Sequence, residues 1–182
     1  MKRLALHPTM GTMAKKLMGA PLRLWHDQLL IKRPGRSGPT AFHYDEAYHP
    51  HAGASHLISV WMALCDVPVE RGCMTFIPGS HRRTDLPPQP QNLKDPCSLL
   101  DVCPALQWEP TVTVPIRTGD CTFHHGRCCH MAAPNTTNEA RVAHVAILMR
   151  ADTRFDGREH PITRSLPLKA GDPLEHEMFP LV

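Results

Sequence analysis

The chain has 182 residues, a formal net charge of +3 and an isoelectric point near 8.5. This length suits one domain with a real core and is short for two domains. The scattered charge, the 5% aromatic content and the lack of a long apolar run exclude a nucleic-acid surface and a membrane span, so we predict neither partner. Nineteen prolines and eleven glycines favour short strands joined by turns.

Residues 1–20 are basic, rich in methionine and free of acidic side chains. We expect a short helix that packs on the domain. A mitochondrial presequence is the alternative, although His7, Pro8 and Gly11 interrupt the apolar stretch. Seven cysteines without a CxxC pair indicate reduced thiols rather than a disulfide framework. We therefore predict a cytoplasmic protein, and the sequence leaves its oligomeric state open.

Apolar and β-branched runs after residue 20 predict a series of short strands separated by Gly, Pro and Asn turns. In the third of these strands the odd positions share one face, with Trp61 among them. From residue 151 onward the chain is charged and broken by prolines, and we assign it no element. The predicted strands are residues 23–32, 41–46, 57–64, 73–77, 111–114, 121–124 and 141–149.

Residues 82–110 lack any periodic pattern and are rich in Pro, Gln, Asn and Asp. A loop of this length in a compact domain is commonly a lid or a binding loop, and we predict that it forms part of the substrate mouth. The predicted organisation is one domain, residues 1–182, with a core over 23–149 and a tail over 151–182. Short antiparallel strands with few helices predict an all-β sandwich, jelly roll or barrel.

His43 and Asp45 lie two residues apart in one predicted strand. Residues at this spacing point to the same face of a strand, which leaves Tyr44 on the opposite face. One nitrogen and one oxygen ligand would then converge on one cation. A surface hydrogen-bonded pair is the plainer alternative. A third ligand has four candidates that spacing does not separate: His124, His125, His130 and His144.

Four blocks of sequence follow one another in a specific order over residues 23–149. They are Phe42–Asp45 with Tyr48 close behind, Trp61 in the next strand, Gly72–His81, and Gly119–Asp120 leading through His130 to Arg141. In order and spacing these blocks resemble the phytanoyl-CoA dioxygenase family of iron(II)- and 2-oxoglutarate-dependent oxygenases. The resemblance implies a double-stranded β-helix, the cupin-like jelly roll, with a short N-terminal helix.

The resemblance also implies that His43, Asp45 and His130 hold iron as a facial triad, which leaves positions open for 2-oxoglutarate and dioxygen. We expect His124 and His125 to surround this site or to lie at the surface rather than to bind the metal.

Arg141 is implied to anchor the distal carboxylate of 2-oxoglutarate, a role that suits its planar donor fork. The residues support this role, because Arg141 shares its strand face with Ala143, Val145 and Ile147, and a charge on an apolar face needs a partner. An ion pair with a carboxylate of the protein is the alternative.

Trp61 and Gln28 match positions that line the co-substrate pocket in relatives. Two departures from the family pattern bear on that pocket. Relatives usually have a longer N-terminal region that supplies a basic residue, for which Lys32 is the expected substitute. Relatives often have a hydroxyl residue two positions after the distal histidine, where this chain has Ala132, so weaker co-substrate binding or a compensating group is expected.

The implied activity is hydroxylation of an unactivated C–H bond, coupled to decarboxylation of 2-oxoglutarate to succinate. Asp45 favours hydroxylation, since related halogenases have a small residue at this position. No basic cluster indicates acyl-CoA, so the expected substrate is a small metabolite or a natural-product intermediate. The alternatives are a catalytically weak or inactive jelly-roll metal-binding protein, and a cupin-type metal-dependent hydrolase or isomerase, which gives Arg141 no role.

Overall fold

The computed structural model describes residues 2–35, 37–52, 57–88, 94–95 and 97–182. Its strands are β1 (Leu22–Lys32), β2 (Thr40–His43), β3 (His51–Ala52), β4 (Leu57–Ala63), β5 (Met74–Phe76), β6 (Val112–Val114), β7 (Cys121–His125), β8 (His130–Ala132), β9 (Arg141–Arg150) and β10 (Arg154–Phe155). Its helices are α1 (Lys2–Ala5), α2 (Pro8–Met18) and α3 (Ser98–Val102), with the short 3₁₀ helices η1 (Asp45–Tyr48), η2 (Val69–Arg71), η3 (Ser80–Arg82) and η4 (Pro104–Trp108).

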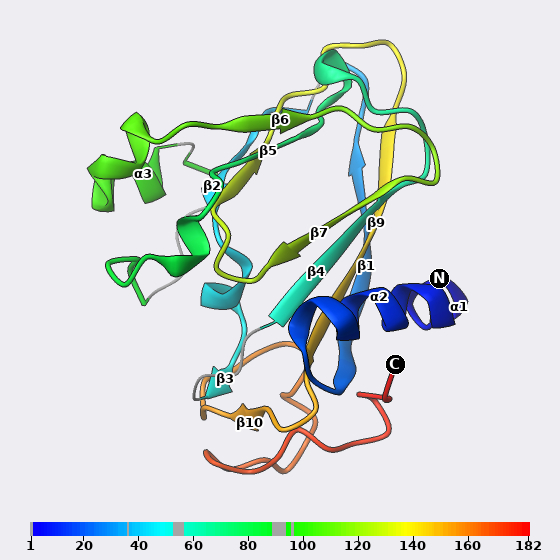
Figure 1. The fold of residues 1–182 in the computed structure, drawn as a ribbon, viewed down its shortest axis with the longest axis vertical. Coiled ribbons are helices and arrows are strands. Elements are labelled where there is room, and N and C mark those ends of the chain that lie inside the picture. Colours follow the sequence, from blue (N-terminus) through cyan, green and yellow to red (C-terminus); the bar gives the residue numbers. More distant parts are fainter. Residues whose placement is uncertain (1, 36, 53–56, 89–93, 96) are drawn as a thin grey trace.

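Two four-stranded antiparallel sheets form the body of the protein (Figure 1). The major sheet has the order β1-β9-β4-β7 and the minor sheet has the order β2-β8-β5-β6. A third, two-stranded sheet pairs β10 with β3. This arrangement confirms the predicted double-stranded β-helix.

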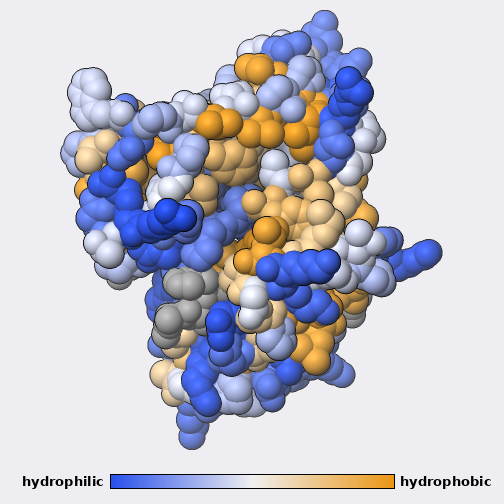
Figure 2. All heavy atoms as spheres, in the orientation of Figure 1, coloured by the Kyte–Doolittle hydropathy of each residue, from blue (hydrophilic) through white to orange (hydrophobic). Residues whose placement is uncertain are grey.

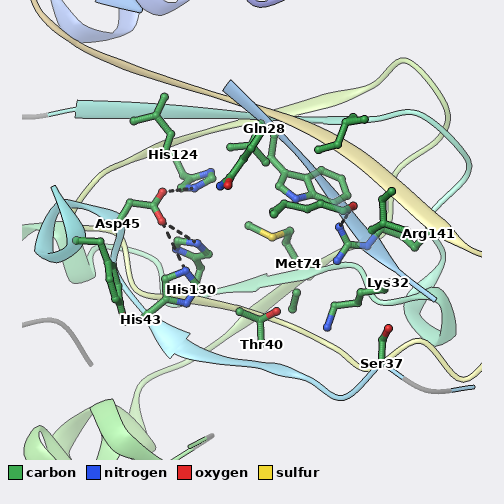
Figure 3. A pocket seen from close by; sticks show the side chains of 18 of the residues that line it. Gln28, Lys32, Ser37, Thr40, His43, Asp45, Met74, His124, His130 and Arg141 are labelled. Carbon is green, nitrogen blue, oxygen red and sulfur yellow. Dashed lines mark hydrogen bonds and ion pairs between the residues drawn. The ribbon is translucent and has the colours of Figure 1, made fainter. Parts of the chain in front are cut away.

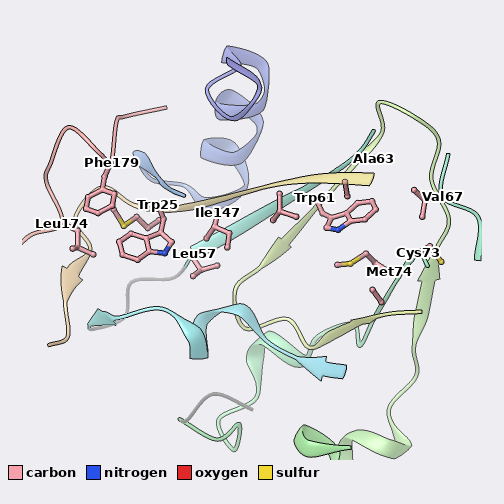
Figure 4. Packing of buried hydrophobic residues seen from close by; sticks show 14 of the residues in the cluster. Trp25, Leu57, Trp61, Ala63, Val67, Cys73, Met74, Ile147, Leu174 and Phe179 are labelled. Carbon is pink, nitrogen blue, oxygen red and sulfur yellow. The ribbon is translucent and has the colours of Figure 1, made fainter. Parts of the chain in front are cut away.

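The main core lies between the two large sheets. β9 is a central strand of the major sheet, and its residues from Ala143 to Met149 are all buried because both of its faces are covered. The face toward the minor sheet carries Trp61 from β4 and Ile147 from β9, which pack with Met74 from β5 (Figure 4). These contacts pack the two sheets against each other, and the candidate site lies between the sheets.

The N-terminal helices cover the outer face of the major sheet. The imidazole of His7 caps α2 by accepting from Thr9, and Gly19 ends the helix in a left-handed conformation. The buried face of α2, with Met10 and Ala14, packs on Ile58 and other outward residues of the sheet. The predicted N-terminal helix is thus confirmed. No helix among the described residues is long and apolar enough to cross a bilayer.

The C-terminal tail differs from the prediction, which assigned it no element. Arg154–Phe155 form β10, and Phe179 stacks on Trp25 with ring centroids 5.0 Å apart. The tail is ordered by single buried side chains and a two-residue strand, which leave no periodic pattern in the sequence.

Residues 82–110 contain α3 and η4 instead of an unbroken loop. Their buried side chains Leu86, Leu99 and Leu106 form a separate cluster with Tyr44. None of the described residues in this range lines the cavity that contains the predicted site. Residues 89–93 and 96 lie outside the described part of the chain, so the role of the segment as a lid stays a prediction.

Candidate metal centre and its cavity

A cavity of about 730 Å³ lies between the two sheets, with walls from β1, β2, β4, β8 and β9 (Figure 3). On the face shown in Figure 2, hydrophobic side chains gather in the upper and central part of the surface, while the protruding edges are mostly hydrophilic. The cavity is lined by every residue that the sequence singled out for the site: Gln28, Lys32, His43, Asp45, Trp61, His130 and Arg141.

Three of these side chains converge at one place in the cavity. His43 ends β2 and His130 begins β8, and the two residues are direct partners across the antiparallel pair. Asp45 begins η1, so it does not lie on the strand as predicted; the extended backbone of Tyr44 still returns its carboxylate to the face of His43. One ligand atom from each of the three lies within 4.8 Å of the others.

The protonation of the two imidazoles suits a cation. The Nδ1 of His43 lies 2.8 Å from the carbonyl oxygen of Ala41, and that of His130 lies 2.9 Å from the carbonyl oxygen of Cys128. A carbonyl oxygen accepts only, so both Nδ1 atoms carry the proton and both Nε2 atoms present a lone pair.

These lone pairs face an acceptor. The Oδ1 of Asp45 lies 3.6 Å from the Nε2 of His43 and 3.7 Å from the Nε2 of His130. Burial lowers the pKa of His130 to about 3, so this ring stays neutral. Burial opposes ionisation of Asp45, but His130 and the hydrogen bond from His124 keep its pKa well below the usual value. Two lone pairs and one carboxylate oxygen without a proton between them form a donor set that fits a divalent metal.

The second oxygen of Asp45 is held from the major sheet. The hydroxyl of Ser59 on β4 donates to Oδ2 at 2.5 Å, and the Nε2 of His124 on β7 lies 3.3 Å from the same atom. Ser59 and His124 are direct cross-strand partners. Their contacts turn Oδ1 toward the two histidines. His124 therefore adjoins the ligand set, as expected. Alternation places Ser59 on the same strand face as Trp61, but its contact with Asp45 depends on tertiary packing.

The other candidate histidines lie elsewhere. The Nε2 of His144 is 2.9 Å from the Oδ2 of Asp27, and the ring of His125 lies against that of His81. Neither of them lines the cavity. Their side chains leave the sheets on faces away from the three converging residues, which the spacing alone did not show.

Two cations occupy the opposite end of the cavity (Figure 3). Arg141 is 2% exposed, lies 5.2 Å from the ring of Trp61 and makes one long hydrogen bond, 3.4 Å, to the carbonyl oxygen of Leu30. Its Nε is buried without a hydrogen-bond partner, and no carboxylate among the described residues pairs with it. Burial lowers its pKa to about 10, so it remains charged at neutral pH.

Lys32 lies beside this guanidinium. Its Nζ donates to the carbonyl oxygen of Gly38 at 2.6 Å. Burial, and then the charge of Arg141, lower its pKa to about 8. Two neighbouring cations without an acidic partner in the described structure are suited to an anionic ligand.

The hydroxyl group of Thr40 lies on the strand opposite Ala132. Thr40 on β2 is the direct cross-strand partner of Ala132 on β8, and both line the cavity. The Thr40 side chain therefore occupies the wall that Ala132 leaves without a polar group. Sequence reasoning missed this residue, because the pairing of β2 with β8 is not visible in the chain order.

The chain is similar to known proteins of one family. The family model described as phytanoyl-CoA dioxygenase (PhyH) matches residues 1–143. Phytanoyl-CoA dioxygenase domain-containing protein 1 of Mus musculus is 29% identical over 67% of this chain and 43% of its own length. Methylphosphonate hydroxylase of Gimesia maris is 30% identical over 70% of this chain and 45% of its own length. The chain spans about half the length of the curated relatives it matches.

Solved structures match the fold over almost the whole chain. The non-heme alpha-ketoglutarate-dependent carbocyclase SnoK from nogalamycin biosynthesis is 44% identical, with a TM-score of 0.85 over 100% of this chain and 70% of that chain. The epimerase SnoN, solved with Fe³⁺, alpha-ketoglutarate and nogalamycin RO, is 41% identical, with a TM-score of 0.84 over 99% of this chain and 72% of that chain.

Proposed function

Because the chain belongs to the phytanoyl-CoA dioxygenase family, we propose that it is an iron(II)- and 2-oxoglutarate-dependent oxygenase acting on a C–H bond of a small molecule. One observation carries the proposal. A single cavity has a two-histidine, one-carboxylate cluster at one place and a buried arginine without a carboxylate partner among the described residues at another. The first group suits a metal and the second suits the free carboxylate of a diacid.

In this proposal His43, Asp45 and His130 hold the iron. Three protein ligands would leave coordination positions open for ligands from the cavity. Iron bound there would activate dioxygen, the oxidant, so that one oxygen atom enters succinate and one enters the substrate while 2-oxoglutarate loses carbon dioxide.

The chain's own part is to bind and to orient. Arg141 and Lys32 receive the distal carboxylate of 2-oxoglutarate, and the Thr40 hydroxyl offers a further donor on the same wall. Trp61 packs against the guanidinium and fixes its direction. The co-substrate is thereby held along the cavity with its keto acid end toward the metal. Apolar side chains of the wall, among them Met74, Val145 and Ile147, reduce the contact of the reacting carbon with water.

Hydroxylation is the outcome that we propose. Asp45 fills the place that related halogenases leave to a small residue, so the metal has no site for a halide. Cyclisation is a second candidate, favoured by the 44% identity to a carbocyclase. The mass of the product separates the two, since hydroxylation adds one oxygen atom and ring closure removes two hydrogen atoms.

The experiment that tests the proposal is an anaerobic titration of the iron(II)-loaded protein with 2-oxoglutarate. We expect the weak visible charge-transfer band of bidentate chelation, and succinate once oxygen is admitted. Asp45→Ala is expected to lose both. Asp152→Ala removes an exposed carboxylate that pairs with Arg150 at the surface, and it should leave both unchanged. Near-normal succinate formation by Asp45→Ala would remove Asp45 from the metal site. Iron binding without the band in the unmodified protein would favour a metal-binding protein without oxygenase activity.

A further inference from the structure

The cavity continues along β1 away from the end that Lys32 and Arg141 line. Its far part is lined by His26 from β1 and by Tyr48 and His49 at the end of η1. His26 and Lys32 are six residues apart on one strand, which corresponds to about 20 Å. His26, Ile147, Ser59 and His124 are successive cross-strand partners, so His26 lies three strand spacings, about 14 Å, from His124 beside the ligand set. A five-carbon diacid that reaches from Arg141 to the ligand set leaves the side of the cavity at His26 uncovered. The region around His26 is therefore free for another molecule.

The volume of the cavity supports the same conclusion. About 730 Å³ lies within the range of roughly 300–1,000 Å³ in which pockets enclose drug-sized ligands. Leu29 and Ile31 form the apolar rim on β1 and are 40% and 56% exposed. Val145 and Ile147 add apolar surface from β9. A substrate that reaches the metal from this side passes mostly hydrophobic side chains.

The charges of the cavity decide what kind of molecule it can hold. Among the described lining residues outside the histidines, only Lys32, Asp45 and Arg141 are ionisable at neutral pH. Loaded iron brings two positive charges, which Asp45 and the chelating carboxylate of 2-oxoglutarate balance. The distal carboxylate lies with Lys32 and Arg141 at the other end. No lining residue near His26 carries a charge that could pair with an ionised substrate. The nearby guanidinium of Arg158 donates to the carbonyl oxygens of Ala47 and His49, pairs with Asp156 and does not line the cavity.

The histidines of this region are neutral hydrogen-bonding groups. Burial lowers the pKa of His26 to about 4 and that of His49 well below 6.5, and the nearby charge of Asp45 does not overcome this effect. The indole Nε1 of Trp25 donates to Nδ1 of His49 at 3.0 Å, so the proton of His49 is on Nε2. His49 is therefore a fixed donor, and His26 is a neutral partner for a hydroxyl or a carbonyl oxygen.

We propose that the region formed by His26, Tyr48 and His49 binds the part of the substrate that is oxidised, and that this substrate is an uncharged, mainly apolar molecule with hydroxyl or carbonyl groups. An ionised group buried here would have no counter-charge, and an uncompensated buried charge is strongly unfavourable. The inference rests on the proposed function, because the charge balance includes bound iron and 2-oxoglutarate.

The test compares two probes that share one skeleton, of which only the second carries a charged group. Estradiol is a rigid, uncharged polycycle with a hydroxyl at each end, and estradiol 3-sulfate has the same skeleton with a negative charge. Equilibrium dialysis against the anaerobic protein loaded with iron(II) and 2-oxoglutarate measures both. We expect estradiol to bind with at least tenfold lower Kd than the sulfate. Equal binding, preference for the sulfate, or binding of neither probe would overturn the inference.

A variant with an added cation tests whether the preference for the uncharged probe arises near His26. His26→Lys places a cation in the far region, and we expect it to lower the Kd of the sulfate at least fivefold while raising that of estradiol. Thr12→Lys adds the same charge on the exposed face of α2, on the outer side of the major sheet and away from the cavity, and should change neither value. An equal effect of both variants would show that the preference is a property of net charge and would overturn the inference.

The charge-transfer band, recorded on the same samples, separates the two proposals. A sample with the band but with preference for the sulfate refutes the substrate inference alone. A sample with bound iron and no band refutes the co-substrate site, and with it the proposed function on which the inference rests.

Discussion

Arg141→Met should change stability and co-substrate binding in opposite directions. Burial lowers the pKa of Arg141 from 12.5 to about 10. Each pKa unit corresponds to about 1.4 kcal/mol, so the charged side chain costs the unliganded protein roughly 3 kcal/mol. Its contact with Trp61 offsets about 1–2 kcal/mol of this cost, and the 3.4 Å hydrogen bond to the carbonyl oxygen of Leu30 contributes little to stability. Methionine fills a similar volume without the charge, so we expect the free energy of unfolding to rise by about 1–2 kcal/mol.

The affinity for 2-oxoglutarate should be lower in the same variant. Loss of one partner of a buried charge pair costs roughly 2–5 kcal/mol, which raises the Kd about 30-fold or more. Urea unfolding of the metal-free protein measures the first effect, and anaerobic titration of the iron(II)-loaded protein measures the second. Arg150→Met is the matched control, because Arg150 lies on the same strand and pairs with Asp152 at the surface.

The control is expected to change neither quantity appreciably. A less stable Arg141→Met protein with unchanged affinity for 2-oxoglutarate would show that Arg141 is a structural residue, and the reasoning from its missing partner would be wrong. A more stable protein with unchanged affinity would place the distal carboxylate elsewhere in the cavity.

Three further predictions follow from the contacts of the site. His124→Leu should weaken metal binding about 10- to 100-fold, measured by titration of the metal-free protein with Co(II), because Oδ2 of Asp45 loses a donor; His124→Gln, which keeps a donor, should restore most of the affinity. Thr40→Val should raise the Kd of 2-oxoglutarate about tenfold through the loss of one hydroxyl, and Ala132→Ser in the same protein should recover binding from the facing strand. Acid should destabilise the metal-free protein. The pKa of His26 is about 4 in the folded state and 6.5 in the unfolded state, so the unfolded state binds more protons below pH 6.5. His26 alone should lower the free energy of unfolding by about 2 kcal/mol between pH 7 and pH 5, as measured by urea unfolding.

Each of these predictions has a result that contradicts it. Equal Co(II) affinity of His124→Leu and the unmodified protein would mean that Ser59 alone orients Asp45. Failure of Ala132→Ser to recover binding, while the fold is intact, would place the Thr40 hydroxyl outside the co-substrate contacts. A flat dependence of stability on pH between 7 and 5 would show that His26 is as accessible to protons in the folded protein as in the unfolded one.

The sequence by itself determined most of the longer strands and named residues that the structure brings together in one cavity, but it missed the short strands β3, β8 and β10. Alternation along the apolar runs marks their faces, and this local rule placed Trp61 and Arg141 on largely apolar faces of their strands. The arginine was informative because a charge among Ala143, Val145 and Ile147 conflicts with the face it occupies. The order of the four blocks then indicated the fold, and the structure agrees with it.

The tertiary structure alone decided the contacts that join separate strands. Ser59 meets Asp45, Thr40 faces Ala132 and the tail residue Phe179 covers Trp25, each through a pairing of segments far apart in the chain. A single side chain at such a contact leaves no periodic signal. The charge of the cavity is also decided by tertiary structure. The packing of the two sheets determines which ionisable groups line the cavity, and the burial of each group there determines whether it is ionised.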